Sequence, residues 1–264
     1  MSLKLKALTA IKVFRAFGIL QLLKLSMHKL GSGSARHLEI PLPTGVRIAT
    51  SSEWTDLFFS RILGVPLDKV RSARVEYSNY QGSFEGKVKV PRKQFFDSIF
   101  DLGPGMSEFL YTAILVSKPQ KVIETGVAAG VSTNTILSAL QLNGIGNLVS
   151  IDITTQVGEL VDENLKNLWR LQILPEIGKE KAFARYLQQN TDATIFLHDS
   201  DHSDSWQKKE FENLIREIPG IEFIFFDDIG QGLIDFIKLN FENYETTVLD
   251  ENRKFSGVVH KRRV

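Results

Sequence analysis

The chain has 264 residues and a formal net charge of +1, with 43% hydrophobic and 24% charged residues. This composition is typical of a folded protein, and the length allows one large α/β domain with a smaller appendage. The absence of cysteine excludes disulfides, thiolate catalysis and cysteine-ligated zinc or iron–sulfur sites. It also suits a reducing compartment, so we expect a cytoplasmic location.

The N-terminal segment is basic. Residues 1–38 hold seven Lys or Arg side chains and no acid, so the other 226 residues hold 25 basic and 31 acidic side chains. This body carries no basic pattern typical of nucleic-acid binding, and we expect no nucleic-acid partner. Lysine and arginine interrupt the apolar residues of 1–30, which leaves no uncharged run of about 18 residues to span a membrane. They also interrupt any signal-peptide core.

We predict a basic amphipathic helix over residues 1–30, and two interpretations of it stay open. In the first interpretation, the apolar side of the helix packs on the rest of the chain or on a second subunit. Packing on a second subunit would make the protein a homo-oligomer. Alternatively, the helix lies on an anionic membrane surface, making the protein peripheral to the membrane.

Residues 31–104 are predicted to form a mainly helical cap that shapes a substrate pocket. Gly31 to Ala35 reads as a flexible break. Ser51 and Ser52 are good helix N-caps and indicate a short helix reaching Leu63. The aromatic and glycine content of Tyr77 to Val90 favours a loop or hairpin. No catalytic motif is recognisable in this region.

Residues 105–264 show a regular alternation of elements. A helix is predicted over Met106–Val116, before Pro119. Short apolar runs predict strands at Lys121–Thr125, Asn147–Asp152, Trp169–Leu174, Ala193–His198 and Ile221–Phe226. Helices are predicted between and after them at Val131–Leu142, Glu159–Lys166, Lys179–Gln189, Asp204–Glu217 and Gln231–Asn240. Two final runs, Tyr244–Leu249 and Phe255–Lys261, predict an antiparallel hairpin. The pattern indicates an α/β, Rossmann-like sheet of seven strands, mostly parallel, with the helical cap in front of it.

The first strand leads into a turn, Glu124-Thr125-Gly126-Val127-Ala128-Ala129-Gly130, which opens a helix. The two glycines allow a tight turn and a close approach to a ligand, which the helix N-terminus can also bind. The pattern is neither Gly-x-Gly-x-x-Gly nor a P-loop. An acid before the turn favours a cation such as a sulfonium, and Asp152 at the end of the second strand can accept both hydroxyls of a ribose.

Residues 105–264 resemble the class I S-adenosylmethionine (SAM)-dependent methyltransferases, whose Glu/Asp-x-Gly-x-x-x-Gly loop matches Glu124 to Gly130. The resemblance implies that Glu124, Gly126 and Gly130 lie against the methionine part of SAM, with Ser132 nearby. It also implies that Asp152 holds the ribose. Leu174-Pro175-Glu176 stands where many relatives have an acid that contacts adenine, so the adenine contact stays open.

A second polar group follows the fourth and fifth strands: Asp199, Asp201, His202, Asp227 and Asp228. The carboxyl ends of parallel strands share one crevice, and four carboxylates there would repel one another without a cation. Oxygen ligands favour Mg²⁺, Ca²⁺ or Mn²⁺ over zinc. The non-catalytic alternatives are that Asp201 and Ser203 cap the helix beginning at Asp204, that His202 is structural, and that the other carboxylates are only solvated.

These strand ends resemble the metal-dependent O-methyltransferases, particularly those acting on sugars and the cephalosporin-hydroxylase-like group. The resemblance implies Asp199, Asp227 and Asp228 as Mg²⁺ ligands and His202 as the catalytic base. The main hypothesis is methyl transfer from SAM to a hydroxyl of a small molecule, for which a sugar is one candidate. The alternatives are a metal-independent N- or O-methyltransferase and a SAM-binding protein without transferase activity.

Overall fold

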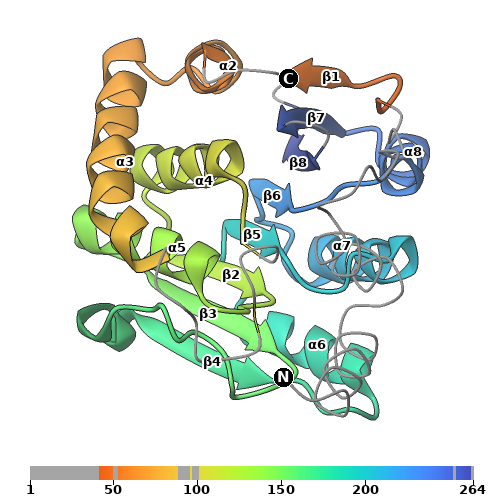
Figure 1. Cartoon of the computed structure of the whole chain (residues 1–264). Helices are drawn as coiled ribbons and strands as arrows, with labels where there is room; N and C mark the ends of the chain where they lie inside the picture. The colour runs from red at the N-terminus through yellow and green to blue at the C-terminus, as the bar shows by residue number, and fades with distance from the viewer. Residues whose placement is uncertain (1–41, 50–52, 89–95, 97–100, 252–253, 263–264) are drawn as a thin grey trace, which may run out of the picture.

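The computed structural model describes residues 42–49, 53–88, 96, 101–251 and 254–262. Within these residues one sheet has eight strands in the order β1-β7-β8-β6-β5-β2-β3-β4 (Figure 1). The strands are β1 (Arg47–Ala49), β2 (Lys121–Thr125), β3 (Asn147–Asp152), β4 (Trp169–Ile173), β5 (Ile195–His198), β6 (Phe223–Phe226), β7 (Tyr244–Glu251) and β8 (Lys254–Lys261).

Strands β2 to β6 are mutually parallel, as the apolar runs predict. β5 and β6 are buried along their whole length, because helices cover both faces of the sheet. In the register of the sheet, Thr125 pairs with both Ile151 and His198. The carboxyl ends of β2, β3 and β5 therefore lie level with one another, and the residues that follow them meet at one edge.

The C-terminal hairpin is also confirmed. β8 pairs antiparallel with both β6 and β7. The eighth strand, β1, pairs parallel with β7 at the edge of the sheet, where Arg47 lies opposite Thr247. The sequence around Pro43 and Gly45 gave no sign of a strand, since only three residues form it and their partner lies at the far end of the chain.

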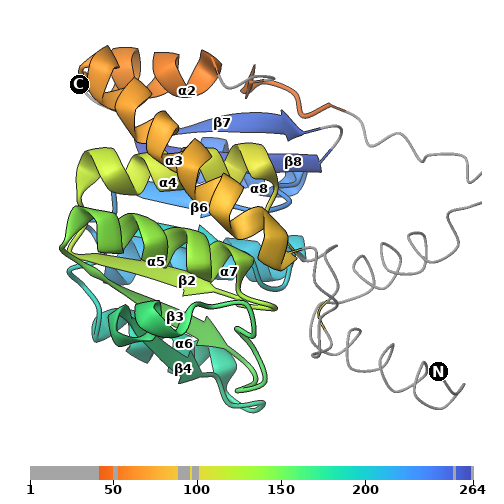
Figure 2. The same ribbon diagram turned by 60° about the vertical axis from the view of Figure 1, so that its left-hand side comes forward.

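Helices cover both faces of the sheet (Figures 1 and 2). One side carries α3, α4 and α5, and the other carries α6, α7 and α8. Each side has its own core, built around Phe109 and Leu137 on the first and around Phe211 and Ile234 on the second. The helices are α2 (Glu53–Leu57), the π-helical turn η1 (Phe58–Ile62), α3 (Leu67–Val88), α4 (Pro104–Ser117), α5 (Val131–Asn143), the 3₁₀ turn η3 (Glu163–Leu168), α6 (Lys179–Gln188), α7 (Asp204–Glu217) and α8 (Gln231–Asn240).

The loop or hairpin predicted over Tyr77–Val90 is wrong, because α3 continues to Val88. Val70, Ala73, Tyr77 and Phe84 are buried along one side of this helix. Their spacing is helical. The glycines of α3 cost about 1 kcal/mol each in a helix, and packing of this side against α4 outweighs that cost.

The helix predicted over Glu159–Lys166 begins later than expected. The N–H groups of Gly158 and Leu160 donate to the carbonyls of Ala128 and Ala129, each at 2.9 Å. The segment is therefore bound to the glycine turn after β2, and the helical turn η3 starts only at Glu163.

The basic helix predicted over residues 1–30 lies outside the described residues and stays a prediction. None of the helices in the described ranges combines the length and the apolar character that a membrane span requires.

Candidate active site

The turn between β2 and α5 lies directly against the chain that follows β5. Gly126 has a φ of +80°, and a Cβ there would lie 2.0 Å from the carbonyl oxygen of Asp199. Gly130 has a φ of +94°, and its Cβ would lie 2.7 Å from Cγ2 of Val161. Glycine alone combines this φ with so close an approach. Both predicted glycines are therefore required by the geometry of the turn.

The carboxyl group of Glu124 is completely buried at the end of β2. Its Oε2 accepts hydrogen bonds from the hydroxyls of Thr133 at 2.8 Å and Ser150 at 2.6 Å. Its Oε1 has no hydrogen-bond partner within the described part of the chain. Burial raises the pKa of Glu124 to about 7, although hydrogen bonds from Ser132, Ser150 and Thr133 act in the opposite direction. Ser132 thus lies beside Glu124 and is itself buried.

Asp152 is held in place at the end of β3 by backbone amides. Its Oδ2 accepts from the N–H of Val127 at 2.9 Å, and its Oδ1 accepts from Ile153 at 2.7 Å and Thr154 at 3.2 Å. Burial raises the pKa of Asp152, and these three hydrogen bonds oppose the rise. Oδ2 accepts a single bond here, so it retains capacity for a ligand hydroxyl.

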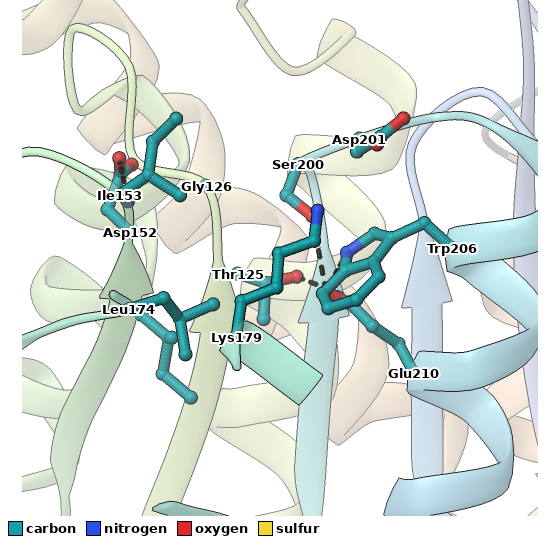
Figure 3. A pocket seen from close by; sticks show the side chains of 11 residues that line it. Thr125, Gly126, Asp152, Ile153, Leu174, Lys179, Ser200, Asp201, Trp206 and Glu210 are labelled. Carbon is teal, nitrogen blue, oxygen red and sulfur yellow. Dashed lines mark hydrogen bonds between the residues drawn. The ribbon is translucent and has the colours of Figure 1, made fainter. Parts of the chain in front are cut away.

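A pocket of about 430 Å³, its open mouth included, lies at the carboxyl ends of β2, β3 and β5 (Figure 3). Asp152 and Ile153 stand on one side of it and Trp206 on the other, with Lys179 in front. The Nζ of Lys179 lies 3.9 Å from the centre of the Trp206 ring. Asp152, the apolar side chains of Ile151, Ile153 and Leu174, and the glycine turn at Gly126 all line this pocket.

A buried hydrogen-bond network around Glu210 of α7 supports this pocket, and the sequence analysis did not identify it. Glu210 Oε2 accepts from Thr125 Oγ1 at 3.0 Å and pairs with His198 Nδ1 at 2.6 Å. Glu210 Oε1 accepts from Trp206 Nε1 at 2.6 Å and from Ser200 Oγ at 3.3 Å. An acid on the apolar side of a helix, next to Phe211, is the sequence signal that could have revealed it.

The structure brings together three of the residues predicted for metal binding and catalysis. Asp199, His202 and Asp227 each offer a ligand atom, and these atoms lie within 4.8 Å of one another. His202 Nε2 is 4.0 Å from Asp199 Oδ1. Burial and the neighbouring carboxylate of Asp227 raise the pKa of Asp199 well above its usual value. Two carboxylates and an imidazole form a donor set that fits a divalent cation.

Asp228 lies at the margin of this group. Its Oδ2 is 3.9 Å from Nδ1 of His202, and its φ of 56° is rare for a residue other than glycine. Its carbonyl oxygen accepts a hydrogen bond from Gln207 Nε2 at 3.1 Å. The turn after β6 is therefore held in an unusual conformation beside the predicted base.

The contacts of His202 fix its tautomer. Nδ1 lies 2.9 Å from the carbonyl oxygen of Asp227, which can only accept a hydrogen bond. Nδ1 must therefore donate, and in the neutral ring Nε2 carries the lone pair. Ser203 does cap α7, since its Oγ accepts from the N–H of Trp206 at 3.4 Å, whereas Asp201 accepts from the N–H of Ser203 at 3.0 Å in the turn before the helix.

Lys254, at the start of β8, also belongs to the acidic group and was not predicted. Its Nζ lies 2.9 Å from Asp227 Oδ2 and donates to the carbonyl of Asp101 at 3.2 Å. Close by, Glu251 accepts the N–H groups of Gly105 and Met106 at the start of α4. No local motif marks Lys254, because its partners lie in distant parts of the sequence.

Comparison with known proteins gives one family match and several structural neighbours. Residues 123–229 match a family model described as a methyltransferase domain. No curated protein matches the chain.

The structural neighbours are all distant in sequence. Cofactor-bound Rv0187 from MTB is 12% identical with a TM-score of 0.47, and the match covers 82% of this chain and 99% of that one. The O-methyltransferase TomG from Streptomyces achromogenes, in complex with SAM, is 14% identical with a TM-score of 0.47 and coverages of 80% and 96%. An O-methyltransferase from Bacillus cereus in complex with SAH is 16% identical with a TM-score of 0.44 and coverages of 79% and 97%.

The family match covers the glycine turn and the carboxyl ends of β3, β5 and β6, where the polar residues gather. Over these residues the chain is similar to a methyltransferase domain, and its sheet, mostly parallel with a C-terminal antiparallel hairpin, is Rossmann-like.

Proposed function

We propose that the protein is an O-methyltransferase that transfers the methyl group of SAM to a hydroxyl of a small molecule, assisted by a divalent cation. The observation that carries the proposal is the contact between Gly126 and the backbone of Asp199. It places the turn assigned to SAM beside the group of Asp199, His202 and Asp227. A methyl donor on one side and a group that binds and deprotonates an acceptor on the other would share one reaction space.

The cofactor would be held by the residues predicted from the sequence. Asp152 retains an acceptor for the ribose, and the N-terminus of α5 presents its N–H groups at the glycine turn. Glu124, Gly126, Gly130 and Ser132 would form the methionine end of the site. SAM would supply a methyl group made electrophilic by its sulfonium.

Asp199, Asp227 and Asp228 would hold the cation, with His202 next to it. Bound there, a divalent cation makes a coordinated hydroxyl more acidic. The Nε2 lone pair of His202 would take the acceptor proton. The acceptor oxygen would bond the methyl carbon as the bond from that carbon to sulfur breaks, with the electron pair remaining on sulfur.

The acceptor would bind between residues 31–104, predicted to select it, and the SAM-binding domain of residues 105–264. A link between the two supports this assignment, since Lys87 at the end of α3 forms an ion pair with Asp162, just after the segment bound to the glycine turn. A sugar hydroxyl is the first acceptor to test.

Calorimetry with S-adenosylhomocysteine (SAH) tests the cofactor part of the proposal. We expect micromolar binding, about −8 kcal/mol, and a loss of at least about tenfold in Glu124→Ala and Asp152→Ala. Absence of binding to the unaltered protein would remove the proposal.

Methyl transfer from labelled SAM to a panel of sugars, phenols and amines, with and without Mg²⁺, tests the chemistry. Asp227→Asn should abolish Mg²⁺-dependent transfer, whereas the exposed Asp235→Asn serves as a control with the same chemical change. Transfer to amines alone, or turnover unaffected by Asp227→Asn, would contradict the assignment.

A further inference from the structure

Asp227, a central residue of the proposed metal site, already has a cationic partner. Lys254 Nζ lies 2.9 Å from Asp227 Oδ2, and the hydroxyl of Ser256 lies 3.4 Å from Asp227 Oδ1. The Asp227 side chain is only 4% exposed. Both carboxylate oxygens therefore already have a partner in the protein, and the ammonium at Oδ2 would repel a metal ion approaching that oxygen.

The ammonium interacts with the whole acidic group. Burial lowers the pKa of Lys254, but the charges of Asp227, Asp228 and Asp199 outweigh it, so the pKa is raised and the charged form is favoured. Lys254 thus performs the electrostatic role that a bound cation would perform.

Lys254 also has a route away from Asp227. Its side chain is 26% exposed, in contrast to Asp227. A lysine ammonium sits on a flexible four-carbon stem and is readily hydrated. Its second contact is a single hydrogen bond to the carbonyl of Asp101. Lys254 therefore reaches the protein surface on a flexible stem, and two contacts with other residues, to Asp227 and Asp101, hold its ammonium.

We propose that Lys254 is a built-in counter-cation that competes with the divalent metal for Asp227. The metal site is complete only when Lys254 has moved away, so the affinity of the protein for divalent cations is held low. The inference rests on the proposed metal site, but it concerns metal binding alone and needs no acceptor. Competition of this kind reduces the apparent affinity by the fraction of molecules in which Asp227 is available.

Mn²⁺ binding to the full chain, followed by the loss of the free Mn²⁺ signal in electron paramagnetic resonance, tests the proposal. Lys254→Met removes the charge and keeps much of the stem. We expect this variant to bind Mn²⁺ about tenfold or more tightly than the unaltered protein, and Lys254→Arg to bind it no more tightly. Lys209→Met is the matched control, since Lys209 forms a 2.9 Å ion pair with Glu180 on the exposed side of α7. It should leave Mn²⁺ affinity unchanged.

Thermal unfolding gives a second readout that does not depend on activity. Mn²⁺ should raise the melting temperature of Lys254→Met more than that of the unaltered protein, because the metal replaces the lost charge. Lys254→Gln serves if the Met variant does not fold, and SAH binding reports that each variant is folded. Equal or weaker Mn²⁺ binding in the charge-removing variants would overturn the proposal. SAH binding and Mg²⁺-dependent methyl transfer could still be intact in that case, which separates this failure from failure of the proposed function.

Discussion

The buried carboxyl of Glu124 should make the folded state less stable as the pH rises. Its pKa is about 7 in the fold, against 4.5 for an exposed glutamate. Between these values the native state keeps the proton and the unfolded chain releases it, so the free energy of unfolding falls as the pH increases. Each pKa unit is worth about 1.4 kcal/mol, which gives a loss of about 3 kcal/mol between pH 4.5 and pH 8. The loss should level off above the folded pKa.

Glu124→Gln removes this titration and leaves most of the site intact. The amide oxygen can still accept the hydroxyls of Thr133 and Ser150 that Oε2 accepts in the unaltered protein. Urea unfolding of both proteins at intervals from pH 5 to pH 8, without cofactor, should show the unaltered protein losing about 2.5 kcal/mol relative to the variant. The raised pKa of Asp199 affects both proteins and largely cancels in the difference. A stability difference that is constant across this range would refute the reasoning, because Glu124 would then ionise equally in the folded and unfolded states.

Three further predictions concern the same edge of the sheet. Gly126→Ala should cost about 2 kcal/mol or more and abolish SAH binding, whereas Gly144→Ala, with a similar positive φ but open space around its Cβ, should cost less in urea unfolding and leave binding intact. Asp152→Asn should weaken SAH binding in calorimetry by about tenfold, because an amide has one acceptor oxygen for the backbone N–H groups and the ribose; unchanged affinity would exclude Asp152 as the ribose ligand. Glu210→Ala should destabilise the fold by about 3 kcal/mol, since buried donors around it lose their acceptor, and Glu210→Gln should recover part of that loss. Equal stability of both Glu210 variants and the unaltered protein would show that the network does not hold the pocket.

Most of the sheet could be predicted because its strands are short apolar runs bounded by glycine, proline or charge. The start and end of β2 and β3 match the predicted Lys121–Thr125 and Asn147–Asp152. β1 could not be predicted, because a three-residue edge strand has too few residues to show a period, and β7 supplies its hydrogen bonds. α3 was missed since its polar residues and glycines conceal four buried positions that only tertiary packing reveals.

The candidate site also contains residues that the sequence predicts and residues that it does not. Asp199, His202 and Asp227 could be placed together from the sequence, since each follows a parallel strand and such strands end at one edge. Lys254 and Glu210 could not, because Lys254 comes from the hairpin and Glu210 from the middle of α7. Their contacts depend on the three-dimensional packing of elements and leave no mark in local spacing.

The pairing of β1 with β7 has a consequence for the order in which the chain can fold during synthesis. Arg47 lies opposite Thr247, about 200 residues later in the chain, and β7 is itself paired with β8. On the ribosome, β2 to β6 and their helices can begin to pack as they emerge, whereas β1 has no partner until the hairpin has left the exit tunnel. The edge of the sheet is therefore completed last, although β1, which completes it, is synthesised before the other strands. A truncation that removes the hairpin should leave β1 unpaired and expose the edge of β6 to other chains.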